Sequence, residues 1–286
     1  MKKTALILGA SGKVGRHSAL AFESASWQVK LFDRQGSDMD TAAQGVDVIV
    51  NGLNPPNYHQ WGSIIPRITE QVIQAAQSSG ATVILPGNVY HFGDSPGIWS
   101  ERTTPAPISR KGEIRLAMEK TYQSSGVQTI VLRAGNFIDP DRCGCVMSTV
   151  YLRQIHRRKL TVPGDDTVKQ AFCYLPDWAR AAAELAQMRG SLATFEDVPF
   201  PNLSISAKEL KLALEKAHGH RIDSVGFPWW LMKATAPFWE LARELNEMRY
   251  LWNTDHTLCS QRLDALLPDF KHSNLQQALK PTHIND

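Results

Sequence analysis

Residues 4–15 read TALILGASGKVG, an apolar run that passes directly into three glycines, Gly9, Gly12 and Gly15. The run predicts a short buried strand, and the composition of residues 13–25 predicts a helix after the glycines. Glycines at this turn let the backbone approach a pyrophosphate, and the helix N-terminus offers it unpaired N–H groups. The spacing is G-x-x-G-x-x-G, and such a triplet indicates a dinucleotide site only in the context of a strand before it and a helix after it. The sequence has both, so it predicts a dinucleotide-binding turn.

The second expected strand, residues 28–33, ends in an acid. The carboxylate of Asp33 can accept hydrogen bonds from both adenosine ribose hydroxyls and would repel a 2′-phosphate, which favours NAD. Arg34 follows it, and this guanidinium can pair with a 2′-phosphate, favouring NADP, or lie over the adenine ring. A solvated loop charge is the alternative for Arg34. We expect NAD or NADP as the cofactor, with NAD favoured.

Strands and helices alternate through the first half of the chain, which predicts a Rossmann-type α/β fold with a doubly wound parallel sheet. Only about a dozen residues separate the second strand from the third, too few for a crossover helix and a further strand. The sheet is therefore expected to lack one strand of its first half or to keep a stub of it. The further expected elements are strands 46–50, 82–86 and 128–133 and helices 59–79 and 110–125.

Beyond about residue 140 the regular alternation weakens. Helices are expected at 145–158, 176–188 and 207–218, and a Trp-rich section spans 227–252, helical over about 236–252. The acids of that section argue against an anionic membrane surface, and its aromatics predict a cap core, a homodimer interface or a pocket wall. We expect an NAD(P)-binding Rossmann domain at 1–140, with part of 165–190 returning to it, and a smaller, mainly helical C-terminal cap at 141–286.

The composition is that of an ordinary globular protein, with 43% hydrophobic residues and 31 basic against 28 acidic residues. This balance gives no electrostatic footprint for nucleic acid. No run approaches the roughly 18 apolar residues of a membrane span. The expected partner is a small-molecule substrate, with no nucleic acid and no membrane, and the expected compartment is the cytoplasm.

Four cysteines stand at 143, 145, 173 and 259. Cys143 and Cys145 are separated by one residue, which is too tight for the usual zinc spacing. His59 and His91 have no second ligand at a suitable spacing. We expect free thiols and no metal.

The glycine turn resembles that of the short-chain dehydrogenase/reductase superfamily, in its extended or atypical, NAD-dependent epimerase/dehydratase-like branch. Further segments along nearly the whole chain are similar to that branch. They are the residues after the third strand (Asn51, Gly52, Leu53), the end of the fourth strand (Pro86, Gly87, Asn88), a segment beside the nicotinamide (residues 132–137) and the return into a helix (residues 172–180). The pair Asp38 and Met39 resembles the family's adenine contact.

The catalytic positions depart from this family. Its working set is a Ser or Thr, a Tyr, and a Lys four residues after the Tyr; the lysine lowers the pKa of the tyrosine. Alignment places Asn88, Lys111 and Arg115 at these three positions. The stretch around Lys111 is similar to that of isoflavone reductase-like members, in which the lysine is taken to be the general acid/base.

Each substituted position has more than one interpretation. Lys111 can be the acid/base, with Arg115 one turn away as the cation that lowers its pKa, a ribose anchor, or a solvated lysine. Asn88 can orient a substrate carbonyl or satisfy the strand end. Tyr90, just past that strand, can be a substitute hydroxyl acid or a packing residue.

The resemblance implies an NAD(P)-dependent oxidoreductase of the atypical short-chain type that acts on a small organic substrate. Two alternatives stay open: an NAD(P)-binding redox sensor without turnover, as in NmrA-like proteins, and a sugar-nucleotide epimerase or dehydratase. The candidate catalytic residues are Lys111, Asn88 and Tyr90. The candidate cofactor residues are Gly9, Ser11, Gly12, Lys13, Val14, Gly15, Asp33, Arg34, Asp38, Met39, Asn51, Gly52, Leu53, Pro86, Gly87, Asn136 and Phe137.

Overall fold

A parallel six-stranded sheet forms the centre of the molecule in the computed structural model, which describes residues 2–33, 35–36, 38–141 and 144–279. The strand order is β10-β6-β4-β3-β1-β2, and every neighbouring pair is parallel. The apolar runs of the sequence form these strands, which are almost entirely buried except for the edge strand β2. Their bounds are β1 Thr4–Leu8, β2 Gln28–Leu31, β3 Val48–Asn51, β4 Thr82–Gly87, β6 Thr129–Arg133 and β10 Phe195–Pro199.

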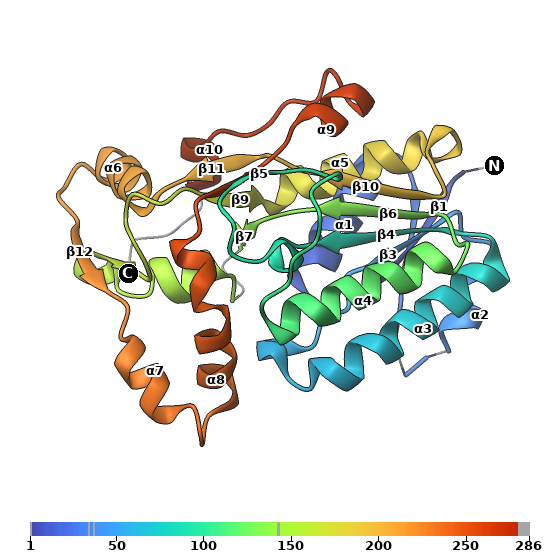
Figure 1. The fold of residues 1–286 in the computed structure, drawn as a ribbon. Coiled ribbons are helices and arrows are strands. Elements are labelled where there is room, and N and C mark those ends of the chain that lie inside the picture. Colours follow the sequence, from blue (N-terminus) through green and yellow to red (C-terminus); the bar gives the residue numbers. More distant parts are fainter. Residues whose placement is uncertain (1, 34, 37, 142–143, 280–286) are drawn as a thin grey trace.

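Helices cover both faces of the sheet (Figure 1). One face packs against α1 and α5 around Phe22 and Trp178, and the other against α3 and α4 around Trp61 and Tyr122. The expected α/β fold with a doubly wound sheet is therefore confirmed. These helices are α1 Lys13–Ser24, α3 Trp61–Ser79, α4 Arg110–Ser124 and α5 Leu175–Gln187.

The first half of the sheet is short, as its spacing predicts. Only β2 lies on the far side of β1, and the chain returns to β3 through the five-residue helix α2, Met39–Ala43. The connection has no room for a crossover and another strand.

The remaining chain forms a second region that contains short strands as well as helices, whereas the sequence led us to expect a mainly helical cap. The expected helix 145–158 is a π-helical stretch, Met147–Tyr151, followed by a 3-10 turn, Ile155–Arg157. A separate apolar cluster around Phe172, Leu214 and Trp252 holds this region together. Its elements include β7 Asn136–Ile138, β8 Lys159–Val162, β9 Gln170–Tyr174, β11 Leu203–Ile205, β12 Asp223–Gly226, α6 Ala207–His218, α7 Trp229–Thr235, α8 Glu240–Glu247 and α10 Leu275–Leu279.

Late segments of the chain return to the first domain. The edge strand β10 belongs to the main sheet, and α9, Gln261–Leu266, packs against it. Arg262 at α9 forms an ion pair with Glu196 of β10 at 2.6 Å. A small two-stranded sheet joins β5, Gly97–Trp99, to β13, His256–Leu258.

Within the described part of the chain, no helix combines the length and the apolar character that crossing a bilayer requires. The cysteines at 145, 173 and 259 are free thiols. Cys143 lies outside the described residues.

Candidate functional site

The glycine turn packs β1, α1 and β3 against one another without room for side chains. Gly9 has a φ of +71°, and a Cβ on Gly15 would lie 2.3 Å from the carbonyl oxygen of Gly9. A Cβ on Gly52, after β3, would lie 2.8 Å from the carbonyl oxygen of Leu8. Gly12 is the N-cap of α1 and supplies no side-chain cap. The first turn of α1 therefore keeps backbone N–H groups that can bind an anion.

The other predicted residues of the turn, Ser11, Lys13 and Val14, differ in their surroundings. Ser11 is exposed beside Gly12, whereas Val14 is buried at the start of α1. Lys13 reaches across the turn and donates from Nζ to the carbonyl oxygen of Gly144 at 3.0 Å. This bond joins the turn to the segment that follows β7.

Asp33 lies just after β2 with an exposed side chain, and its Oδ1 accepts a hydrogen bond from the backbone N–H of Gln35 at 3.0 Å. Arg34 lies outside the described residues. Asp38 caps α2, because its carboxylate accepts hydrogen bonds from the N–H and the hydroxyl of Thr41, both at 2.8 Å. These bonds lower the pKa of Asp38. Met39 packs partly against the core beside α3.

The ends of β3 and β4 carry the next predicted residues. Asn51 donates to the hydroxyl of Tyr122 at 3.2 Å and accepts from the N–H of Leu53 at 3.1 Å. The carbonyl oxygen of Pro86 accepts a hydrogen bond from Arg115. Gly87 allows close packing, since a Cβ there would lie 2.6 Å from Val131.

Asn136 and Phe137 form the start of β7, which pairs with β9. The ring of Phe137 lies edge-on to that of Trp178 with centroids 6.1 Å apart. Gly135 before them touches the neighbouring strand, because a Cβ there would lie 2.0 Å from the carbonyl oxygen of Ala171. The segment is therefore fixed to the return strand β9.

Lys111 is buried, with its side chain 2% exposed, and forms ion pairs with two carboxylates of the cap. Its Nζ contacts Glu244 and lies 2.5 Å from Glu247, both on α8. It also lies 5.1 Å from the ring centroid of Tyr58. A solvated lysine at the start of α4 is therefore not what the structure shows. The ammonium group binds α8 to the first domain.

Arg115 lies one turn further along α4 and is also buried. Its guanidinium donates to the carbonyl oxygen of Pro86 and packs 5.9 Å from the ring centroid of Trp61. Among the described residues its Nε has no hydrogen-bond partner. A buried donor without a partner is costly, so this atom is suited to a ligand group at the end of β4.

Tyr90 forms a hydroxyl pair with Tyr58, whose role no sequence pattern indicated. The two hydroxyl oxygens lie 3.1 Å apart. Burial raises the pKa of Tyr90, against the opposing effects of the Tyr58 hydroxyl and the Arg115 charge. Tyr90 therefore keeps its proton at neutral pH and can act as a donor. Tyr58 is held at a φ of +62°, in a segment where Asn57 and Gln60 also have positive φ. Such backbone strain is found mainly where the surrounding structure fixes a functional side chain.

Asn88 connects the site to a buried charge network below it. Its Oδ1 accepts from the N–H of Tyr90 at 3.1 Å, and its carbonyl oxygen accepts from Arg133 at 2.6 Å. The fully buried Arg133 also pairs with Glu119 at 2.8 Å and Asp197 at 2.6 Å. Sequence reasoning missed this network, because its members come from three separate elements.

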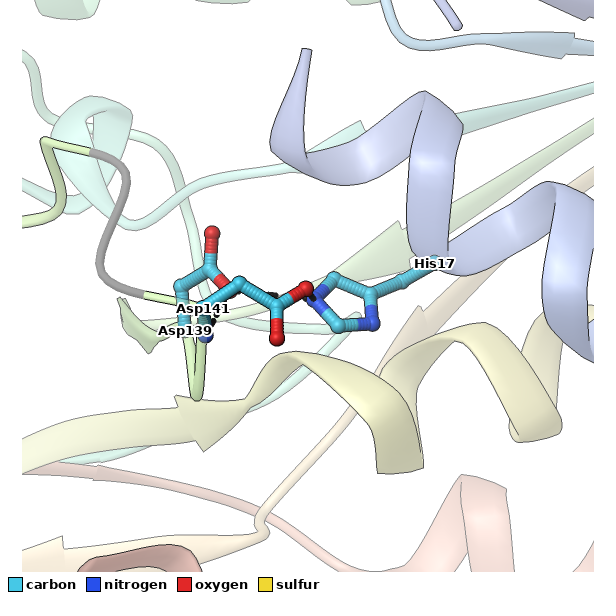
Figure 2. A group of neighbouring side chains, drawn as sticks. All are labelled: His17, Asp139 and Asp141. Atoms are coloured by element: carbon cyan, nitrogen blue, oxygen red, sulfur yellow. Dashed lines mark hydrogen bonds and ion pairs between the residues drawn. The ribbon is translucent and has the colours of Figure 1, made fainter. Parts of the chain in front are cut away.

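Figure 2 shows a further cluster in which His17 of α1 points toward Asp139 and Asp141 after β7. Their ligand-type atoms lie within 4.8 Å of one another. Arg16 already pairs with both acids, at 3.2 Å and 3.0 Å, and His17 Nε2 lies 3.0 Å from Asp139. A cation is therefore already present, and the cluster connects α1 to the loop after β7. The expectation of no metal stays a prediction.

Comparison of the chain with family models and with curated proteins finds no match. Its fold, however, matches that of solved structures over nearly the whole length. MoeE5 in complex with UDP-glucuronic acid and NAD has a TM-score of 0.74 at 14% identity, covering 99% of this chain and 97% of that one. UDP-glucuronic acid 4-epimerase from Bacillus cereus, in complex with UDP-glucuronic acid and NAD, has a TM-score of 0.74 at 16% identity, covering 98% of each chain.

A nucleoside-diphosphate-sugar epimerase from Staphylococcus aureus has a TM-score of 0.69 at 19% identity, covering 97% of this chain and 99% of that one. Identities this low establish the fold and leave the activity to be argued from the site. The comparison therefore shows that the chain shares the Rossmann-type α/β fold of these solved structures.

Proposed function

We propose that the chain binds a nicotinamide dinucleotide across the carboxyl ends of β1 to β4. The observation that carries this proposal is the contact between Gly15 and Gly9, which brings the uncapped N-terminus of α1 to the turn. A pyrophosphate there would accept hydrogen bonds from backbone N–H groups and interact with the helix dipole. Asp33 would accept hydrogen bonds from the adenosine ribose, which favours NAD over NADP.

The residues beyond this turn support an oxidoreductase that acts on a small organic substrate. A bound nicotinamide would supply or accept the hydride. In the reducing direction, the Tyr90 hydroxyl would donate its proton to the oxygen of the substrate carbonyl. Tyr58 would return a proton to Tyr90 through the bond between the two hydroxyls, and solvent would reprotonate the half-buried Tyr58. Arg115 would bind the nicotinamide ribose or a substrate oxygen through its unpartnered Nε.

Lys111 is the sequence-based candidate for the proton transfer, and that role stays a prediction. Its two ion pairs favour a different one, in which it positions α8 over the site. These ion pairs also favour the second candidate function, a redox sensor without turnover, because they occupy the ammonium group at the catalytic position. Among substrates, sugar nucleotides are the class to test first, since MoeE5 and the Bacillus cereus epimerase of this fold are in complex with UDP-glucuronic acid.

The proposal is tested by calorimetric titration of the purified protein with NADH and with NADPH, repeated on Asp33→Ala and Lys111→Ala. We expect NADH to bind more tightly than NADPH. Asp33→Ala should weaken NADH binding by roughly tenfold, because two hydrogen bonds to the ribose are lost. Lys111→Ala should leave NADH affinity within a few-fold, because Lys111 is engaged by α8.

The assay for turnover then follows NADH consumption with simple aldehydes and ketones, and product formation from UDP-sugars by chromatography, comparing the wild type with Tyr90→Phe. Loss of turnover in Tyr90→Phe, with unchanged NADH affinity, supports the proton-donor role. Tight binding of NADH without any turnover supports the sensor. If neither cofactor binds below the millimolar range, the dinucleotide proposal is wrong and the glycine turn is purely structural.

A further inference from the structure

Helices α7 and α8 form a hairpin that projects from the body of the molecule, and the connection between them lies at its far end (Figure 1). Large apolar side chains on it are exposed to solvent: Phe238 is 95% exposed, Trp230 75%, Trp239 46% and Leu231 39%. We call these four residues the aromatic tip. Soluble proteins rarely leave an apolar patch of this kind uncovered unless it binds something.

The aromatic tip is not part of the hairpin's own packing. The inward side of the hairpin is filled by Met232, Ala242 and Met248, which are buried. Trp229 packs on Trp252, with ring centroids 5.2 Å apart. On the opposite side, Trp230, Leu231 and the exposed Ala234 lie on one face of α7 by their helical spacing, and Phe238 follows in the turn beyond it. The hairpin therefore carries apolar side chains on both its inward and its solvent-exposed side.

The acids of the hairpin all turn toward the first domain. Glu240 pairs with His59 at 2.8 Å, and Glu244 and Glu247 pair with Lys111. These three are the only acids between residues 227 and 252. The sequence-based objection to a membrane, which rested on their presence, is therefore removed by their position.

The hairpin and the segments next to it also carry cations, of which Arg243 pairs with Glu240 and Glu244. Lys233 is exposed on α7. Arg249 lies 5.2 Å from the ring centroid of Trp229, and Arg153, from the neighbouring segment, lies 5.6 Å from that of Phe227. Within the part of the chain that the structure describes, none of these three forms an ion pair. The exposed aromatics are thus accompanied by positive charge that has no acidic partner.

We propose that the aromatic tip docks onto the surface of a bilayer that contains anionic phospholipids. Tryptophan and phenylalanine are favoured at the boundary between headgroups and acyl chains, and each nearby cation adds attraction to anionic headgroups. A symmetric pair of copies fits less well, because a two-fold contact through this face of α7 would bring the exposed Lys233 of both subunits close together. The proposed docking is peripheral and shallow. Its site is separate from the glycine turn that we propose binds the dinucleotide.

The experiment is co-sedimentation of the full chain with vesicles of phosphatidylcholine alone and with vesicles of phosphatidylcholine mixed with phosphatidylglycerol. We expect the wild type to bind the mixed vesicles and to dissociate as salt is added. Phe238→Ser and Trp230→Ser should each weaken binding by about tenfold, because each removes a large apolar side chain from the interface. The double variant Lys233→Gln and Arg249→Gln should lose the preference for phosphatidylglycerol.

Leu212→Ser is the matched control, because Leu212 is 57% exposed on α6, outside the hairpin. This variant should bind the mixed vesicles as the wild type does. The midpoint of thermal unfolding is measured for every variant. A midpoint equal to that of the wild type shows that the variant is folded. The proposal is overturned if the wild type fails to bind the mixed vesicles, or if Phe238→Ser and Trp230→Ser bind like Leu212→Ser. It is also overturned if the tip variants convert a dimer into monomers while the wild type does not bind vesicles, because the tip then contacts a second copy.

Discussion

At the scale of single residues, the glycine turn gives the most direct test of the cofactor site. In Gly15→Ala the added Cβ meets the carbonyl oxygen of Gly9 at 2.3 Å, so the turn must open. We expect NADH affinity to fall by tenfold or more and unfolding free energy to fall by about 1–3 kcal/mol, typical of overpacking. Alanine favours helix over glycine by up to about 1 kcal/mol, which offsets part of the stability loss but none of the affinity loss.

Titration calorimetry and chemical denaturation measure the two quantities. Gly190→Ala is the control, because a Cβ at Gly190 meets no heavy atom within 4 Å. Wild-type NADH affinity in Gly15→Ala would mean that the dinucleotide binds elsewhere.

Individual residues also show where sequence reasoning stops. The glycine positions could be predicted, because their spacing and the strand before them are local in the chain. The partners of Lys111 could not, since Glu244 and Glu247 lie more than a hundred residues away on a helix whose docking depends on the whole cap. Tyr58 was missed for the same reason: only the folded chain brings its hydroxyl to Tyr90. Asp38 was predicted as an adenine contact, yet its bonds to Thr41 already explain it as a helix cap.

At the scale of elements, Lys111 is expected to hold α8 in place. Replacing it by Met removes the cation that pairs with Glu247 and leaves Glu244 only its ion pair with Arg243 at 3.3 Å. Loss of one partner from a fully buried pair costs 3–5 kcal/mol, and the partial exposure of these acids reduces this to about 2 kcal/mol. Hydrogen exchange measured by mass spectrometry should therefore become faster in residues 240–247 and stay unchanged in α6.

The triple variant Lys111→Met, Glu244→Gln, Glu247→Gln separates this role from proton transfer. Removing all three charges should restore slow exchange in α8. If catalytic turnover stays lost in the triple variant while exchange is restored, Lys111 carries the proton as the sequence suggests. Unchanged exchange in Lys111→Met alone would contradict the positioning role.

Elements with strong local patterns could be predicted well. The helices α1, α3, α4, α5 and α6 match their expected ranges to within about two residues, and the short first half of the sheet follows from the length of one connection. The cap was predicted less well, because its strands are three to five residues long and pair over long sequence distances. Strand β10 shows the same limit: it completes the main sheet from residues 195–199, which no periodic pattern marks.

At the scale of the whole molecule, the first domain is built over the charge network of Arg133. This guanidinium is fully buried at the end of β6 and joins β4, α4 and β10 through Asn88, Glu119 and Asp197. Burial alone would lower the pKa of Arg133, and the two carboxylates raise it instead. The position of Asn88 in the candidate site and the attachment of the edge strand β10 therefore both depend on Arg133. Stability and site geometry are coupled through this residue.

His91 makes this network sensitive to acid. Its Nδ1 lies 3.2 Å from Arg133 Nη1 and accepts a hydrogen bond from it, so the ring must be neutral there. Burial, with the Arg133 charge, lowers the pKa of His91 from 6.5 to about 4. A histidine with a depressed pKa in the folded state contributes stability that is present above the unfolded pKa of 6.5 and is lost as the pH falls toward 4. The loss amounts to about 3 kcal/mol over this range.

The measurement is chemical denaturation of the wild type and of His91→Asn across that pH range. The asparagine carbonyl can accept the same hydrogen bond from Arg133 without titrating, so the variant should lose about 3 kcal/mol less on acidification. Asp197, whose pKa is raised mainly by burial, acts in the opposite direction, but it is present in both proteins and cancels in the comparison. If both proteins lose stability equally between pH 6.5 and about pH 4, His91 is not held neutral by the fold, and the acid sensitivity of the domain comes from its carboxylates.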